Sequence, residues 1–226
     1  MQATKVHTVR DKRIVPTTLD WREKGIVAPI KNQEECGCCY AFSAISALES
    51  RNAQKTGKLV KLSEQNMVDC SGSSGCNGGW PNASFQYIID NEGVNTEEAY
   101  PYKAKRGDCK FNPSAVGATV KEYVKIETGN ESDLLDAVAD GPVSVALRGV
   151  DSVLGFYAKG IFDRPCTKYD IIDHAMTVVG YGSENGKDYW IVRNSWGPEK
   201  GEDGYVRFAR GKNLCGIADA AFYPVV

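Results

Sequence analysis

The two halves of this 226-residue chain carry different hydrophobic patterns, and this difference most limits the folds open to it. In the first half, apolar side chains recur at helical spacing. Phe42, Ile45 and Leu48 share one face of a run that begins at Cys39 and that Gly57 can end. This run predicts a helix of about five turns.

Three further helices and a set of strands follow. Ser63 is a suitable N-cap for SEQNMVDC, and Pro81 begins PNASFQYIIDNEG, which ends near Gly93. A short helix, ESDLLDAVADG, joins the two halves. The second half contains β-rich, glycine-bounded segments: PVSVALRG, AMTVVGYG, DYWIVRNSWG and GYVRFARG. Helices followed by strands indicate an α+β fold, which we expect to form two lobes with a cleft between them.

Composition gives no sign of several classes of function. The formal net charge is −2, so no nucleic-acid or membrane-surface partner is expected. No apolar run approaches the roughly 18 residues that a membrane span needs. The opening MQATKVHTVRDKR lacks the apolar core of a signal peptide. We expect residues 1–14 to be an artificial start of the chain or the remnant of a removed pro-segment.

Cysteine usage indicates an oxidising compartment. The chain has eight cysteines, and glycosylation sequons begin at Asn82 and Asn130. Three cysteines, Cys36, Cys38 and Cys39, fall within four positions. A zinc site is a weak explanation, because zinc sites usually use C-x₂₋₄-C pairs with later cysteine pairs or histidines. A second explanation is that all eight cysteines form disulfides, although the adjacent Cys38 and Cys39 cannot easily both find partners.

A catalytic thiol is the third explanation. A cysteine at a helix N-terminus has its thiolate stabilised by the helix dipole and by backbone N–H groups. Only two histidines exist: His7, which we interpret as a solvated side chain, and His174, on an apolar strand. An imidazole beside Cys39 would form a thiolate–imidazolium pair. The amide of Asn194 could then orient the ring.

Four sequence blocks carry a resemblance to a known family. QEECGCCYAFS, CNGGWP, DHAMTVVGYG and YWIVRNSWGPEKGEDGYVRFARG occur in this order. They resemble the signature blocks of the papain-like cysteine proteases, cathepsin L-like members in particular. The segment VPTTLDWREKGIV, from Val15, resembles the start of a mature enzyme, so the similarity extends from there to Val226.

The resemblance implies a papain-like two-lobed fold. A helical left domain and an antiparallel β-barrel-like right domain would enclose the active-site cleft. The peptidase domain would occupy residues 15–226, with the helical lobe at about 24–125 and the β lobe at about 126–221. The termini would cross over between the lobes.

The resemblance also assigns roles to individual residues. Cys39 would be the nucleophile, His174 the general acid and base, Asn194 the group that orients the imidazole, and Gln33 the oxyanion-hole donor. The implied disulfides are Cys36–Cys76, Cys70–Cys109 and Cys166–Cys215. The residues expected to contact substrate are Gly37, Gly78, Gly79, Trp80, Pro81, Ala146, Ile172, Asp173, Trp196 and Ala220.

Several residues depart from the family pattern, among them Tyr40, which stands where tryptophan is commoner although the signature allows tyrosine. Cys38 stands where serine is usual, and we interpret it as a buried small residue rather than as a redox-sensitive neighbour of the nucleophile. Glu34 and Glu35 stand where small residues are usual. Two carboxylates there could raise the pKa of the thiolate, but we favour a solvated loop, because exposed charges are strongly screened.

These features together predict a thiol endopeptidase that prefers an apolar residue at P2. The five-residue spacer SGSSG leaves no room for the long occluding insertion of the cathepsin B-like dipeptidases. A catalytically silent, peptide-binding or scaffold homologue and an acyl transferase remain alternatives. The resemblance implies a monomeric zymogen, lysosomal, vacuolar or secreted, that uses no metal or cofactor. Its partners would be peptide substrates, a cleaved inhibitory pro-segment and cystatin-like inhibitors.

Overall fold

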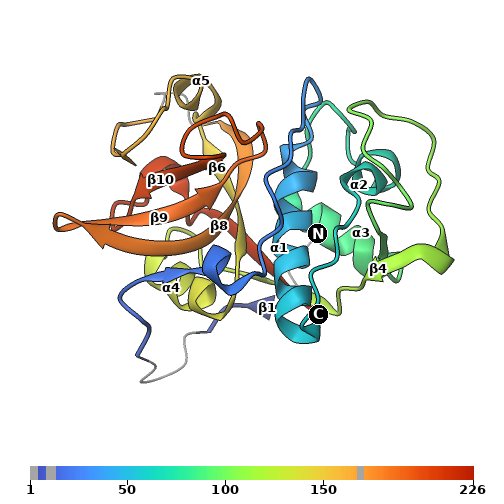
Figure 1. Cartoon of the computed structure of the whole chain (residues 1–226), viewed down its shortest axis with the longest axis horizontal. Helices are drawn as coiled ribbons and strands as arrows, with labels where there is room; N and C mark the ends of the chain where they lie inside the picture. The colour runs from blue at the N-terminus through green and yellow to red at the C-terminus, as the bar shows by residue number, and fades with distance from the viewer. Residues whose placement is uncertain (1–4, 9–13, 167–170) are drawn as a thin grey trace.

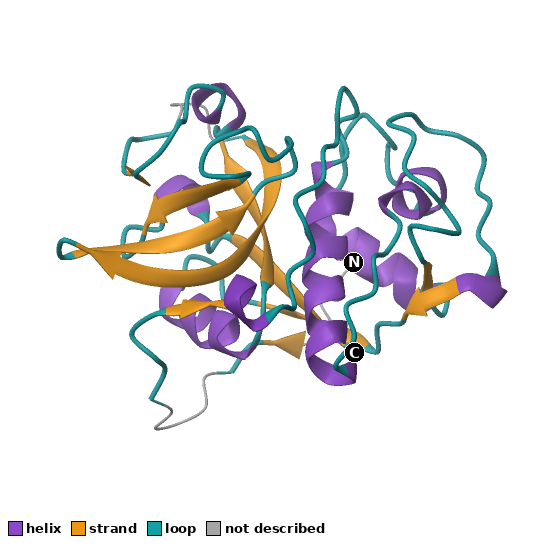
Figure 2. Ribbon diagram, viewed as in Figure 1, coloured by secondary structure: helices purple, strands orange, loops and turns teal. Residues whose placement is uncertain are grey.

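The computed structural model describes residues 5–8, 14–166 and 171–226. It divides into a helix-rich lobe and a strand-rich lobe, which lie side by side in Figures 1 and 2. The α+β fold class is therefore confirmed. Among the described residues, no helix is both long enough and apolar enough to cross a membrane.

The helices begin and end at the residues that the sequence indicates. Helix α1 (Cys39–Thr56) ends at Gly57, whose φ is +73° and whose N–H bonds to the Ala53 carbonyl. Helix α2 (Glu64–Cys70) is capped by the Ser63 hydroxyl. The remaining helices are α3 (Pro81–Asp90), α4 (Glu131–Asp140), α5 (Asp151–Leu154) and the 3₁₀ turns η1 (Trp21–Lys24), η2 (Pro113–Ala115) and η3 (Leu214–Gly216).

One mixed sheet forms the second lobe. Its strands lie in the order β1-β5-β11-β6-β8-β9-β10-β7, and β2 also pairs with β8. The bounds are β1 (Lys5–Val6), β2 (Leu19–Asp20), β5 (Glu122–Lys125), β6 (Val143–Arg148), β7 (Ile161–Phe162), β8 (Ile172–Glu184), β9 (Lys187–Arg193), β10 (Tyr205–Ala209) and β11 (Ala220–Val225). A two-stranded sheet, β3 (Val94–Asn95) with β4 (Val116–Ala118), lies in the helical lobe.

The expectation of a barrel-like, antiparallel second lobe needs a correction. The described strands do not close into a barrel, and the pairs at the two ends of the sheet, β1 with β5 and β10 with β7, are parallel. The central pairs from β5 to β10 are antiparallel, as expected. The sequence could not show the parallel edges, because two-residue strands carry no detectable period.

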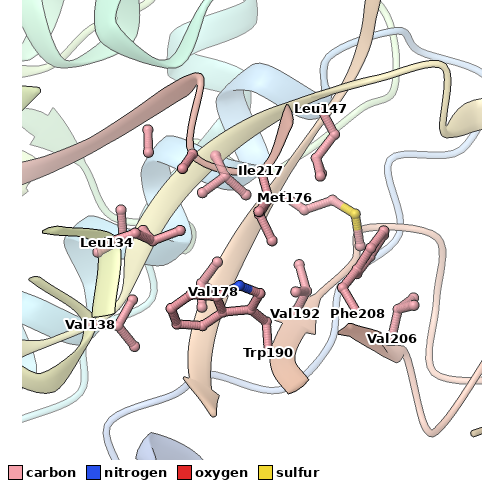
Figure 3. Close-up of a cluster of buried hydrophobic side chains, with 14 of the residues drawn as sticks. Leu134, Val138, Leu147, Met176, Val178, Trp190, Val192, Val206, Phe208 and Ile217 are labelled. Atoms are coloured by element: carbon pink, nitrogen blue, oxygen red, sulfur yellow. The ribbon is translucent and has the colours of Figure 1, made fainter. Parts of the chain in front are cut away.

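Each lobe has its own hydrophobic core. In the β lobe the fully buried Trp190 packs among side chains of α4, β6, β8 and β10 (Figure 3). The helical lobe buries Phe42, Ile45 and Leu48 of α1 against α2 and α3. A third cluster lies between the lobes, where Ala44 and Ala47 of α1 meet β-lobe side chains. Small residues at these two positions let the helix approach the sheet closely.

Polar contacts fasten α1 to the β lobe at two levels. The Ser43 hydroxyl lies 2.6 Å from the Ser144 hydroxyl and also contacts the Met176 carbonyl. Two turns later, the Arg51 guanidinium donates to the carbonyls of Ala137, Gly141 and Pro142. These bonds fix the position of the helix along the sheet.

Six cysteines form three disulfides, the same pairs that the resemblance implies: Cys36–Cys76, Cys70–Cys109 and Cys166–Cys215. Because Cys36 is disulfide-bonded, Cys36-Gly37-Cys38-Cys39 cannot act as a three-thiolate zinc ligand. The two remaining thiols are Cys38 and Cys39.

The interpretation of His7 as a solvated side chain is wrong. Its imidazole is almost fully buried, with Nδ1 3.0 Å from the Tyr223 hydroxyl and Nε2 3.1 Å from an Asp136 carboxylate oxygen. The polar surroundings of His7 in the sequence gave no hint of this, because both partners lie more than 120 residues away.

The Lys31 ammonium group is enclosed by carboxylates inside the helical lobe. Its Nζ lies 3.0 Å from Glu49 and 2.8 Å from Glu64, and both carboxylates are buried. We predict that Lys31→Met lowers the free energy of unfolding by about 3–5 kcal/mol, because it leaves buried carboxylates without a counter-charge. Urea unfolding measures this change.

Lys212→Met is the matched control. It removes an exposed lysine from its pair with Asp163, and we expect a loss below about 1 kcal/mol. Equal effects of the two substitutions would show that the Lys31 cluster contributes no more than a surface ion pair.

Candidate active site

The Cys39 thiol stands at the start of the central helix. Cys39 is the first residue of α1, and Cys38 is the N-cap. Burial raises the pKa of the Cys39 thiol, but the hydrogen bond and positive charge of His174 and backbone groups of Ala175 and Tyr40 outweigh it. The net pKa is therefore lower than that of an ordinary cysteine, so a larger fraction of the thiol is ionised near neutral pH.

The imidazole of His174 is held by an amide on its far side. Its Nε2 lies 2.8 Å from Oδ1 of Asn194, and both residues are buried. The same Oδ1 accepts a bond from the Ser195 N–H, which fixes the amide. The Trp196 ring packs on the imidazole, with ring centroids 4.7 Å apart. This arrangement orients the ring and shields the His174–Asn194 bond from water.

The thiol and the imidazole come from different lobes and meet because α1 packs on β8. Ser43, one turn after Cys39, contacts the carbonyl of Met176, two residues after His174. Thr177 donates from its hydroxyl to the Ser43 carbonyl at 3.2 Å. These contacts set the register between the helix and the strand, and hence the position of the thiol relative to the imidazole.

Gln33 lines the same cleft as the Cys39 thiol. Only one of the two protons on its side-chain amide nitrogen is used in a hydrogen bond to a residue that the structure describes. Its Oε1 accepts from the Ser195 hydroxyl at 2.6 Å, and its Nε2 donates to the Cys36 carbonyl at 2.9 Å. An amide nitrogen carries two protons. Since one proton is used by Cys36, the other can be donated to an oxygen in the cleft.

Glycines form one wall of the cleft for steric reasons. A Cβ on Gly37 would lie 2.5 Å from the Cys76 carbonyl oxygen, which is closer than real contacts allow. Gly37 and the neighbouring segment exchange backbone bonds: Gly37 N–H to Cys76, and Gly78 N–H to Gly37. Gly78 has a φ of +99°. Bulkier residues at Gly37 or Gly78 would disrupt the backbone pairing between these two segments, which form the cleft wall that they share with the thiol.

The cleft has a volume of about 370 Å³ and contains Cys39 and His174 in its lining. Most of the residues predicted to contact substrate also line it: Gly37, Gly78, Gly79, Trp80, Pro81, Ala146, Ile172 and Asp173, together with Gln33. The Trp80 side chain is 47% exposed, so it forms an open rim. Two predicted residues are not part of the lining: Trp196 packs on the imidazole, and Ala220 pairs with Ala146 and packs near Ile172.

The second free thiol differs sharply from the first. Cys38 is completely buried, and its Sγ lies 3.1 Å from the Tyr102 hydroxyl, which donates to the Gln33 carbonyl. Burial raises the pKa of the Cys38 thiol to about 12. A protonated, enclosed thiol is a poor nucleophile, so the geometry supports a packing role over a redox role.

Glu34 and Glu35 lie in an exposed loop, which favours the solvated interpretation. Glu34 adopts a φ of +53°, and its N–H is bonded by the Asn32 side chain.

The sequence reasoning missed three residues that support the site. Ser195 bonds to Gln33, Tyr102 to Cys38, and Asn77 bridges to Gly37. Ser195 could have been found from its place between Asn194 and Trp196. Tyr102 lies in a loop more than 60 residues from Cys38 and carries no local signal.

Comparison with known proteins identifies the family. The family described as "Papain family cysteine protease" matches residues 15–225. A cathepsin L-like peptidase of Aedes aegypti is 52% identical over 218 residues, which are 94% of this chain and 64% of the relative. This chain thus spans less than two thirds of that relative's length.

Two solved structures share the fold. Bromelain from Ananas comosus, in complex with the E64 inhibitor, has a TM-score of 0.89 and 43% identity, covering 94% of this chain and all of that chain. The digestive procathepsin L2 proteinase from Tenebrio molitor larval midgut has a TM-score of 0.92 and 41% identity. That match covers 96% of this chain and 70% of the procathepsin chain.

The two free thiols should differ in reactivity. Iodoacetamide applied to the native protein at about pH 6.5 should alkylate Cys39 and leave Cys38 unmodified, because only Cys39 has a lowered pKa. The alkylation rate should rise as pH increases through the lowered pKa, which lies below the ordinary cysteine value of ~8.5, and then level off. Peptide mapping by mass spectrometry measures both sites.

Cys39→Ser is the matched control and should abolish native labelling. Labelling of Cys38, or a rate that climbs only above about pH 8, would contradict this assignment of the reactive thiol.

Proposed function

The chain belongs to the papain family of cysteine proteases, and we propose that it is an endopeptidase that hydrolyses peptide bonds through an acyl-enzyme on Cys39. The observation that carries this proposal is the thiol of lowered pKa beside an oriented imidazole in an open cleft. Relatives named as cathepsin L-like peptidase and procathepsin support it.

In the proposed first step, the Cys39 thiolate attacks the carbonyl carbon of the scissile peptide bond. The His174 imidazolium gives its proton to the leaving amine, and an acyl-thioester remains on Cys39. Asn194 keeps the ring in place through both transfers. His174 then takes a proton from water, and the resulting attack releases the carboxylic acid and restores the thiolate.

The oxyanion that forms during each attack needs two donors. We assign these to the Cys39 backbone N–H, at the positive end of α1, and to the second amide proton of Gln33. Ser195 and the Cys36 carbonyl hold the Gln33 amide in one orientation, so the donor is in position before the substrate arrives.

Endopeptidase activity is favoured over dipeptidase activity by the loop between Cys70 and Cys76. Only five residues separate these cysteines, and each is fixed by its own disulfide. A loop this short cannot reach over the cleft. No specific observation favours a catalytically silent homologue or a transferase.

We further propose that the protein is made as a zymogen, that cystatin-like proteins inhibit it, and that it acts as a monomer. The procathepsin neighbour supports an inhibitory pro-segment. The digestive and cathepsin relatives, together with three disulfides, support a lysosomal, vacuolar or extracellular location. Residues 1–14 precede the family match and are the candidate remnant of that pro-segment.

The catalytic assignment predicts an ordered series of variants. Cys39→Ala should abolish hydrolysis of a fluorogenic peptide, and His174→Ala should be nearly as damaging, because the two act as one unit. Asn194→Ala should be milder, since it orients and does not react. Steady-state kinetics, with intact mass after treatment with an epoxide thiol probe, measures turnover and labelling.

Cys38→Ser is the control in that series and should retain most activity. Comparable losses in Cys38→Ser and Cys39→Ala would contradict the assignment of Cys39 as the nucleophile. Failure of the probe to label wild-type Cys39 would favour the peptide-binding alternative.

The pocket for the P2 residue predicts substrate preference. Its proposed walls are Trp80, Pro81, Ala146 and Ile172, and its proposed floor is Ala220; none of them carries a charge. An arginine side chain buried there would lack a counter-charge, which costs several kcal/mol. We therefore expect Leu-Arg substrates to exceed Arg-Arg substrates by about a hundred-fold or more in kcat/KM.

Ala220→Glu should shift this preference toward Arg-Arg, because it adds a carboxylate near the pocket. Ala209→Glu would place the same residue on β10, outside the cleft lining, and should leave the ratio unchanged. Equal cleavage of the two substrates by the wild-type protein would rule out this pocket assignment.

A further inference from the structure

The N-terminal residues 5–8 lie outside the family match, yet they are attached to the β lobe. Lys5 and Val6 form β1, which pairs in parallel with Val124 and Lys125 of β5. The His7 N–H continues this pairing with a 2.7 Å bond to the Lys125 carbonyl. Without β1, strand β5 would be the edge of the sheet and its backbone groups on that side would be unpaired.

The His7 side chain fits between two elements of the lobe. Its Nδ1 contacts the Tyr223 hydroxyl on β11, and its Nε2 contacts the Asp136 carboxylate on α4, at 3.0 and 3.1 Å. His7 and Asp136 side chains are each only 6% exposed. A neutral imidazole protonated on Nε2 satisfies both contacts, since it donates to Asp136 and accepts from Tyr223.

Tyr223 connects His7 to Arg51, whose side chain holds α1 of the helical lobe against the β lobe. The Arg51 guanidinium of α1 lies over the Tyr223 ring, 4.2 Å from its centroid, and bonds to three carbonyls at the end of α4. His7 therefore holds the hydroxyl of the same ring whose face supports Arg51. In Figure 1, β1 lies at the bottom of the view, whereas α1 begins with Cys39 at the top.

We propose that the β5 edge, with Tyr223 and Asp136, is a docking site for an extended histidine-bearing segment, and that residues 5–7 of this chain occupy it. The docked segment stabilises the contact between the lobes that Arg51 makes with the carbonyls after and at the end of α4. None of the residues that it contacts lines the catalytic cleft, so the cleft stays open while the segment is bound. This inference is independent of the proposed peptidase activity.

A double-mutant cycle on the full-length protein tests the proposal. His7→Ala should lower Tm by about 4–8 °C, because it removes two buried side-chain contacts, to Tyr223 and to Asp136, from a chain of this size. Tyr223→Phe keeps the ring over Arg51 and removes only the hydroxyl. Its effect in the His7→Ala background should be smaller than in the wild type, since the shared contact is already lost.

Lys5→Met is the matched control. Lys5 lies on β1, two residues before His7, and the substitution removes only its exposed ion pair with Glu122 of β5. Its Tm should change by less than about 2 °C. Additive effects of His7→Ala and Tyr223→Phe, or equal effects of Lys5→Met and His7→Ala, would overturn the proposed docking site.

Hydrogen exchange on the wild-type protein gives a test that needs no variant. The His7 amide should exchange slowly, because it donates to the Lys125 carbonyl. In His7→Ala, protection should fall at residues 5–8 and also at the Gly141 amide, which lies beside the carbonyls that Arg51 binds. Exchange of residues 5–8 at the rate of an unstructured peptide in the wild type would refute docking.

Discussion

The packing of helix α1 against strands β6 and β8 is the contact on which the rest of the structure depends. Ala44 and Ala47 allow the helix to come close, and the Ser43 hydroxyl joins it to both strands. The thiol belongs to the helix and the imidazole to the strand, so neither lobe contains the catalytic pair alone. A larger residue at either alanine would separate the two groups as well as weaken the core.

The electrostatics of the site follow from this packing. Burying a thiol among apolar neighbours raises its pKa, as Cys38 demonstrates. Cys39 escapes the same effect because the helix places it against His174 and against backbone groups at the lobe boundary. The pKa values of two adjacent cysteines are therefore shifted in opposite directions. The difference comes from their surroundings, because Cys38 packs in the core of the helical lobe and Cys39 lines the cleft.

Sequence reasoning predicted the helices well, because Gly57, Ser63 and Pro81 carry local signals for helix ends. It also brought together Cys39, His174 and Asn194, although only through family motifs. It failed where partners are distant or elements are short. His7 finds Tyr223 across 216 positions, and β1 has two residues, so neither leaves a periodic or local trace.

The disulfides have a consequence for how the two lobes are held together. Cys36–Cys76 and Cys70–Cys109 each close a loop in the helical lobe, and Cys166–Cys215 closes one in the β lobe. In the described part of the chain, no disulfide crosses the boundary between the lobes. Contacts between the two lobes are therefore noncovalent, apart from the chain segments that connect them. A reducing agent would remove cross-links inside each lobe and would leave the contacts between the lobes in place.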